Sequence, residues 1–138
     1  MSNVRIEQIP LEMFREMWPH VAPKLFKGLM PIDLTIEQVC DDIVRGASQL
    51  WAIFSDDRLV AAFLTSLDRD GYVSVYGLGG ERVSKWAHAL DDAMQTFAAA
   101  NDMPRVRFSG RAAWSRLLPD YVVTGDHPSG QFVYERAV

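Results

Sequence analysis

The chain has 138 residues, of which 49% are hydrophobic and 23% are charged, and its formal net charge is −4. This composition is typical of a folded soluble protein, the length predicts one domain over residues 1–138, and the negative charge disfavours nucleic-acid binding, which needs Lys and Arg on the phosphates. A single cysteine excludes an internal disulfide, and the short apolar runs and the absence of a secretory leader predict a cytoplasmic protein without membrane contact.

The first 46 residues predict a strand and two helices. Apolar and polar residues alternate over residues 4–9, and a helix follows from residue 11. We expect Pro19 and Pro23 to limit that helix, because proline lacks the backbone N–H donor and clashes with the preceding turn. The Thr-x-x-Gln spacing of Thr35 and Gln38 is a capping box that predicts the start of the second helix, and Gly46 is suited to end it. The expected buried stripe of this helix is Ile36, Val39, Cys40, Ile43 and Val44.

The middle of the chain predicts three antiparallel strands in a meander, at residues 50–54, 59–67 and 72–76. The glycine cluster after them is expected to end the third strand, and the longest helix should follow at residues 81–100. The apolar stripe of that helix repeats every three or four residues and is made by Val83, Trp86, Ala87, Leu90, Met94 and Phe97.

The last third predicts a strand at 105–109, a short helix at 112–118 and two final strands at 121–124 and 131–136. The fold class is therefore α/β, in the mixed α+β sense. We expect a mostly antiparallel central sheet of about six or seven strands flanked by about four helices.

This order of elements resembles the GNAT (Gcn5-related N-acetyltransferase) superfamily over nearly the whole chain. The family's motif, Arg or Gln followed by x-x-Gly-x-Gly or Ala, is matched best by residues 74–79, Ser-Val-Tyr-Gly-Leu-Gly. The resemblance implies that acetyl-CoA is bound by the backbone N–H groups of Gly77, Leu78, Gly79 and Gly80 together with the start of the next helix. The alternative is that these glycines only form a tight connection between strand and helix.

Two positions depart from the family pattern. Ser74 stands where the family has Arg or Gln, and Ser115 follows Trp114 where many GNAT enzymes carry a Tyr that reprotonates the leaving thiolate. The segments 77–80 and 110–121 are most similar to small GNAT-like proteins of tailed phages and prophages. This resemblance implies a protein of the host cytoplasm or the virion that works by binding a protein partner, such as a phage structural protein. The alternative is an acetyl-CoA-dependent N-acetyltransferase acting on an unknown amine.

A basic segment without acidic residues lies between Met103 and Pro119 and contains Arg105, Arg107, Arg111 and Arg116. It is a candidate site for an anion or an acidic partner, and a solvated sheet face is the alternative. The three histidines lack a common ligand spacing, so we expect no metal site and surface positions for His20, His88 and His127.

Overall fold

The computed structural model describes residues 3–29, 35–128 and 130–138. Its elements follow the predicted order, and within those ranges they form a seven-stranded sheet in the order β1-β2-β3-β4-β5-β7-β6. Strands β4 and β5 are parallel, whereas the other neighbouring pairs are antiparallel. The predicted fold class is therefore confirmed. The elements are β1 (Val4–Gln8), η1 (Leu11–Met13), α1 (Phe14–Leu29), α2 (Ile36–Val44), β2 (Gln49–Ser55), β3 (Arg58–Leu67), β4 (Tyr72–Gly80), α3 (Val83–Ala100), β5 (Arg105–Gly110), α4 (Trp114–Leu117), β6 (Val122–Asp126) and β7 (Phe132–Ala137).

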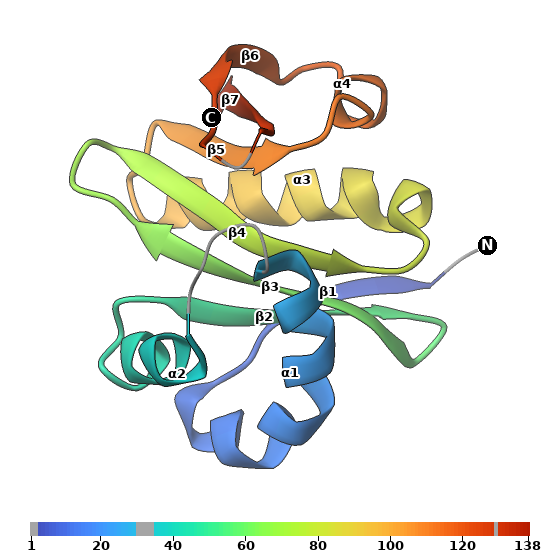
Figure 1. Cartoon of the computed structure of the whole chain (residues 1–138), viewed down its shortest axis with the longest axis vertical. Helices are drawn as coiled ribbons and strands as arrows, with labels where there is room; N and C mark the ends of the chain where they lie inside the picture. The colour runs from blue at the N-terminus through green and yellow to red at the C-terminus, as the bar shows by residue number, and fades with distance from the viewer. Residues whose placement is uncertain (1–2, 30–34, 129) are drawn as a thin grey trace.

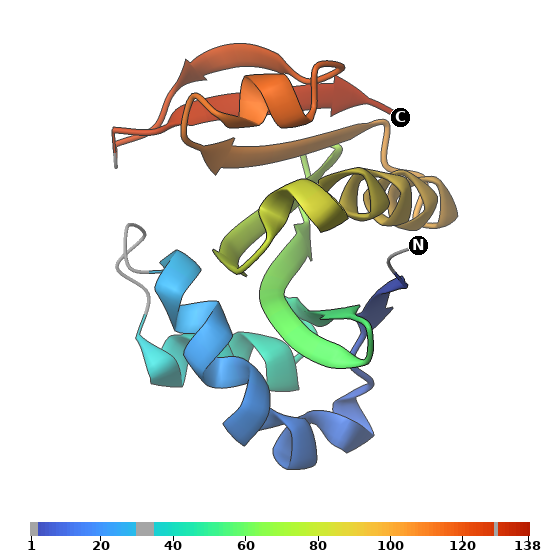
Figure 2. The same ribbon diagram turned by 90° about the vertical axis from the view of Figure 1, so that its right-hand side faces the viewer.

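The sheet has a hydrophobic core on each face. Helices α1 and α2 pack on one face, where Leu25 of α1 and Ile43 of α2 meet side chains of β2 and β3. Helix α3 packs on the other face, where Trp86 and Met94 meet Val75 and further residues of the sheet. The two layers of helices are seen in Figures 1 and 2. Among the described residues, no helix has the length and apolarity needed to span a bilayer.

Helix α1 continues through both of its prolines, so the expectation that Pro19 and Pro23 would limit it is wrong. Each proline removes one backbone hydrogen bond from the helix. Val21 and Leu25 on the same helix are completely buried against the sheet. Burial of such a side chain contributes about 1.5–3 kcal/mol, which offsets the lost bonds.

Helix α2 begins with the predicted capping box. The Thr35 hydroxyl accepts a hydrogen bond from the Gln38 backbone N–H at 3.1 Å, and the Gln38 side chain accepts one from the Thr35 backbone N–H at 3.0 Å. Gly46 has a φ of +80°, as expected at the helix end. The predicted buried stripe was too wide. Only Val39 and Ile43, which are four residues apart, are buried. Ile36 and Val44, at the two ends of the helix, are more than half exposed.

Strand β4 runs through the glycine cluster to Gly80, so the predicted turn at Gly77–Gly80 is wrong. The register with β3 passes from Leu64 opposite Tyr76 to Ala62 opposite Gly79. One extra residue of β4 is thus accommodated in a β-bulge at Gly77, whose φ of +72° suits glycine. The true connection to α3 consists of Glu81 and Arg82.

Helix α3 has the predicted apolar stripe. Its stripe residues are buried or partly buried in the core beside the sheet. Asp91 is an unpredicted member of the buried face, and its side chain interacts with Tyr121 and Arg136.

Candidate functional site

The parallel strands β4 and β5 separate toward their C-terminal ends. Their pairing extends from Tyr72 opposite Arg105 to Val75 opposite Phe108, whereas β4 continues for five residues more beside β3, and β5 continues to Gly110 beside β7. Figure 1 shows the two strands diverging in front of α3. This divergence opens the sheet at its centre.

A cavity of about 770 Å³ occupies this opening. It is lined from both faces of the sheet, because side chains alternate along β4 and β5. Its walls come from the end of α1, from β3, β4 and β5, from the first turn of α3, from α4 and the segment before it, from the β6–β7 connection and from β7. The lining residues are Lys27, Ser66, Asp68, Ser74, Val75, Tyr76, Gly77, Leu78, Val83, Trp86, Arg107, Phe108, Ser109, Gly110, Arg111, Trp114, His127, Gln131 and Val133.

The α3 side of the cavity is apolar, and we call it the apolar arm. It is formed by Val75, Val83, Trp86, Phe108 and Trp114. The Trp114 ring lies 5.2 Å from that of Phe108 and 6.2 Å from that of Trp86, measured between ring centroids. The Trp86 indole N–H donates to the Glu81 carbonyl at 2.7 Å, so this large ring is fixed at the start of α3.

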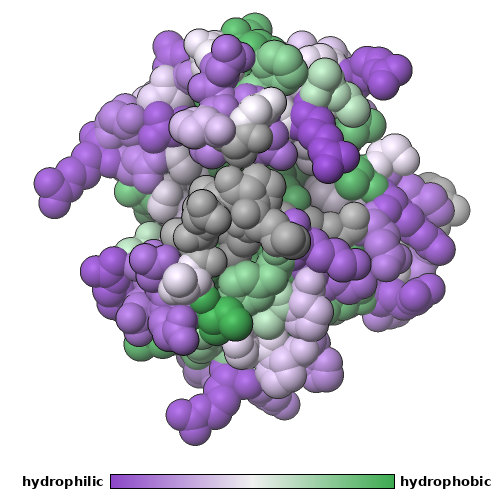
Figure 3. All heavy atoms as spheres, in the orientation of Figure 1, coloured by the Kyte–Doolittle hydropathy of each residue, from purple (hydrophilic) through white to green (hydrophobic). Residues whose placement is uncertain are grey.

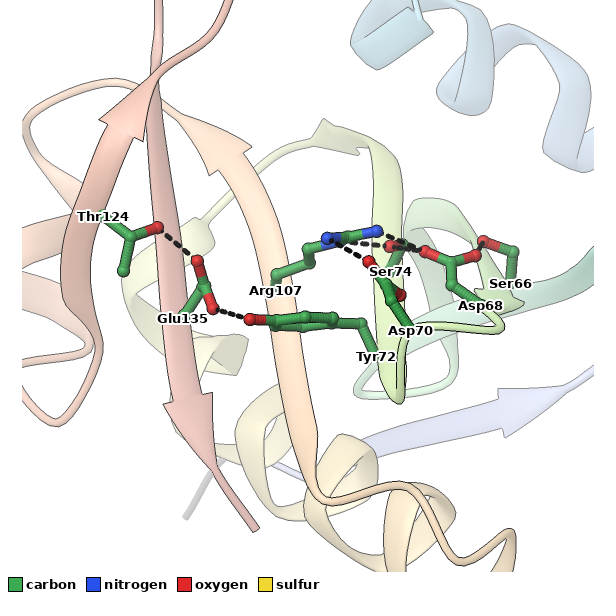
Figure 4. A network of polar contacts seen from close by, with 8 residues as sticks. All are labelled: Ser66, Asp68, Asp70, Tyr72, Ser74, Arg107, Thr124 and Glu135. Carbon is green, nitrogen blue, oxygen red and sulfur yellow. Dashed lines mark hydrogen bonds and ion pairs between the residues drawn. The ribbon is translucent and has the colours of Figure 1, made fainter.

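The α1 side carries a polar network centred on Arg107, and we call this side the polar arm. Its lining residues are Lys27, Ser66, Asp68, Ser74 and Arg107. Within the network the Arg107 guanidinium donates to the Ser74 hydroxyl at 2.8 Å, to Asp68 at 2.8 Å and to Asp70 at 3.1 Å (Figure 4). Its central carbon also lies 4.2 Å from the centroid of the Tyr72 ring. All three guanidinium nitrogens are thus engaged inside the protein.

Two carboxylates of the network are held in the ionised form. Burial tends to raise the pKa of Asp68, but hydrogen bonds from Ser74, Ser66 and Arg107 outweigh it and hold that pKa below its ordinary value. Glu135 accepts hydrogen bonds from Thr124 and Tyr72, which lower its pKa. The network is therefore a stable set of charges at neutral pH.

The sequence-predicted site residues divide into three groups. Gly77, Leu78, Arg107 and Arg111 all line the cavity. Gly79 and Gly80 lie next to it in β4, paired with Ala62 and Ala61 of β3. Arg105 lies exposed at the start of β5, and Arg116 is exposed on α4.

The departures from the GNAT motif have structural partners. Ser74 donates its hydroxyl hydrogen bond to Asp68 and accepts one from Arg107. The Ser115 hydroxyl lies 3.4 Å from that of Tyr134, which is fully buried and donates to the Arg111 carbonyl at 2.7 Å. Both serines therefore take part in the protein's internal contacts.

Several lining residues were not predicted as site residues from the sequence, although Asp68 was considered as an acid that could deprotonate an amine, with a structural role favoured. Lys27 lies in the last turn of α1, Asp68 at the end of β3, and His127 in the β6–β7 connection, where it was expected only as a surface residue. These three residues are 41 and 59 positions apart in the chain. Nothing local in the sequence indicates that they meet, because the sheet topology brings them together.

Comparison with solved structures supports the fold assignment. The chain superposes on an IAA acetyltransferase from Bacillus cereus with a TM-score of 0.69 and 11% identity, covering 99% of this chain and 100% of the other. It superposes on the PaiA N-acetyltransferase from Thermoplasma acidophilum, in complex with coenzyme A, with a TM-score of 0.65, 15% identity and 99% of each chain covered. A GNAT family acetyltransferase from Elizabethkingia anophelis with acetyl-CoA bound gives a TM-score of 0.69 at 7% identity, again over 99% of each chain.

No protein-family model and no curated protein matches the sequence. The structural likeness nevertheless extends over the whole length of each compared chain. The protein therefore has the fold of the GNAT acetyltransferases.

Proposed function

We propose that the protein binds an acyl-CoA thioester in the β4–β5 cavity and transfers the acyl group to an amine. The observation that carries this proposal is a cavity at the splayed centre of the sheet, lined by an apolar arm on one face and a polar arm on the other. Two reactants can enter such a cavity from opposite faces and meet between the strands. Two of the compared structures hold coenzyme A or acetyl-CoA.

The apolar arm suits the thioester and its uncharged pantetheine chain, which gain from contact with Trp86, Trp114 and Val83. The phosphates of the donor would lie at the start of α3. Arg82 there has a φ of +57°, and this helix start has no side-chain cap. Its first-turn N–H groups and the Arg82 guanidinium are thus suited to hold an anion.

Acyl transfer needs a neutral amine. The amine nitrogen attacks the thioester carbonyl, the new C–N bond forms as the C–S bond breaks, and the proton lost by the amine balances the charge of the departing CoA thiolate. His127 lines the cavity, and its imidazole is a side chain that can accept a proton from an amine. Asp68 is a weaker base, because its hydrogen bonds lower its pKa.

A cavity-filling variant tests the proposal. Val83 lines the apolar arm and is only partly buried, so Val83→Trp should place an indole in the arm while α3 stays folded. We expect calorimetric titration to show acetyl-CoA binding to the wild type and at least tenfold weaker binding to Val83→Trp. Release of free CoA thiol in the presence of an amine panel should fall in parallel.

Val44→Trp is the matched control, since Val44 is 57% exposed on α2 and does not line this cavity. It should bind acetyl-CoA as the wild type does. Absence of acetyl-CoA binding to the wild type at millimolar concentration would rule out the proposed activity.

A binding role without catalysis is a second candidate. It is favoured by the internal partners of Ser74 and Ser115 and by β6, whose five residues are all exposed and include Val122 and Val123. Figure 3 shows hydrophobic side chains at this end of the molecule. A protein partner, such as a phage structural protein, would cover this strand. If a phage encodes the protein, mass spectrometry of its purified virions would test that role. Virions that do not contain this protein would contradict it.

A further inference from the structure

The cavity carries an excess of positive charge in a protein that is negative as a whole. Its charged lining consists of Lys27, Arg107 and Arg111 with one carboxylate, Asp68, whereas the chain has a formal net charge of −4. Cations collected in a concave site raise the local concentration of anionic ligands. The lining therefore indicates which acceptors the cavity favours.

Two of these cations remain available to a ligand. Arg107 is occupied by Asp68, Asp70 and Ser74. Among the described residues, by contrast, neither Lys27 nor Arg111 forms an ion pair.

Two acidic residues next to cavity-lining segments are already paired. Glu81, at the connection before α3, lies 3.4 Å from Lys24, and Asp70 lies 3.1 Å from Arg107. Lys24 thus pairs with Glu81, whereas Lys27, about one turn further along the same helix, forms no ion pair with the described residues. An anionic group entering between α1 and the sheet would meet an ammonium group that has no ion-pair partner in the part of the chain that the structure describes.

We infer that the acceptor amine also carries an anionic group, a carboxylate or a phosphate, and that Lys27 binds this group with support from Arg111. This inference rests on the proposed acyl transfer and specifies its second substrate. Lys27 comes from α1 and so lies on the same face as the polar arm. The anionic group of the acceptor is bound on the α1 face of the sheet. Its amine extends from there toward the thioester between the diverging strands β4 and β5. Lys27 and Arg111 are both exposed, but they line a concave cavity, where an ion pair should strengthen binding more than one on an open surface.

Matched acceptor pairs test the inference. Each pair differs only in the anionic group: phenylalanine against phenethylamine for the carboxylate, and O-phosphoethanolamine against ethanolamine for the phosphate. With saturating acetyl-CoA, at least one anionic member should show a kcat/KM at least tenfold above that of its uncharged counterpart. The pair with the larger ratio identifies which anion the site prefers.

A lysine variant assigns the effect to the residue. Lys27→Met should raise the KM for the anionic acceptor about tenfold and bring the kcat/KM ratio between the anionic and the uncharged member of the pair close to one, while the KM for acetyl-CoA stays unchanged. Arg58→Met is the control, because Arg58 is an exposed cation in the β2–β3 hairpin and does not line the cavity. It should leave every constant unchanged.

Three results would overturn the inference. Equal turnover of both members in both pairs would show that the acceptor needs no anion, although acyl transfer itself would stand. A raised KM for acetyl-CoA in Lys27→Met would assign the lysine to the donor phosphates. If no amine is acetylated, calorimetric titration with phenylalanine and O-phosphoethanolamine decides, and failure of both to bind the wild type refutes the anion site. Absence of acetyl-CoA binding refutes the transferase proposal separately.

Discussion

Gly110, the last residue of β5, has no space for a side chain. A Cβ atom there would lie 2.4 Å from Cδ1 of Trp114 and 2.8 Å from its Nε1. Trp114 in turn packs on Phe108 and forms part of the apolar arm. We predict that Gly110→Ala lowers the free energy of unfolding by about 1–3 kcal/mol, because the indole must leave its packed position. Urea denaturation followed by fluorescence would measure the change.

Gly125 in β6 provides the matched control. Apart from its chain neighbours, no described atom lies within 4 Å of a Cβ built there, and its φ is not positive. Gly125→Ala should change the unfolding free energy by less than about 0.5 kcal/mol, as is usual for surface positions. Equal unfolding free energies of the two variants would show that Trp114 can move away from residue 110 without loss of stability.

At the scale of elements, the Asp68–Arg107 contact ties the β3–β4 hairpin to β5. Strands β4 and β5 pair over only four residues. The ion pair between Arg107 Nη2 and Asp68 Oδ2, at 2.8 Å, therefore adds to a short parallel ladder. The side chains of Arg107 and Asp68 are 32% and 27% exposed, which weakens their interaction. We predict that Asp68→Asn lowers the unfolding free energy at pH 7 by about 1 kcal/mol.

The same variant should alter the pH dependence. Because the pKa of Asp68 is lower in the folded state, its contribution is present above its unfolded pKa of about 4 and is lost as the pH falls through the folded value. The stability difference between wild type and Asp68→Asn should therefore shrink below about pH 4. Denaturation curves between pH 3 and 7 measure it. Asp57→Asn is the control, because the Asp57 side chain is 82% exposed and its ion pair with Arg5 should contribute little to stability, so the difference should be near zero throughout. A constant stability difference for Asp68→Asn over this pH range would contradict the role of its carboxylate.

At the scale of the whole molecule, Asp91 links α3 to the C-terminal strands. Asp91 is only 8% exposed. Its carboxylate accepts a hydrogen bond from the Tyr121 hydroxyl at 2.8 Å and forms an ion pair with Arg136 of β7. Burial and the neighbouring Asp91 raise the pKa of Tyr121, so the phenol remains a donor. We predict that Asp91→Asn destabilises the protein by about 2–3 kcal/mol, because the partly buried Arg136 loses the closer of its two carboxylate partners and keeps only the exposed Asp120 at 3.7 Å.

The adjacent Asp92 is exposed and serves as the control for this variant. Asp92→Asn should have a thermal unfolding midpoint within about 2 °C of the wild type, since surface changes are usually within 0.5 kcal/mol. The Asp91→Asn midpoint should fall by several times that amount. Similar midpoints for the two variants would mean that the cluster around Tyr121 does not hold α3 to β7.

The sequence alone determined the order and type of the elements. Their signals are local: the three-to-four-residue stripe of α3, the alternation in β5, and the Thr35 capping box each lie within a few turns or one strand. Gly77 was also identified as a candidate, because a glycine cluster next to a long helix stands out in the chain. Local interactions suffice for these features, so local patterns reveal them.

Only the tertiary structure decided how far β4 extends, whether α1 continues past its prolines, and which residues line the cavity. The β4 bulge depends on pairing with β3, and α1 is maintained by burying Leu25 against the sheet. Lys27 and His127 meet at one cavity although they are 100 positions apart. Such contacts depend on packing between distant segments, and that packing outweighs local propensity.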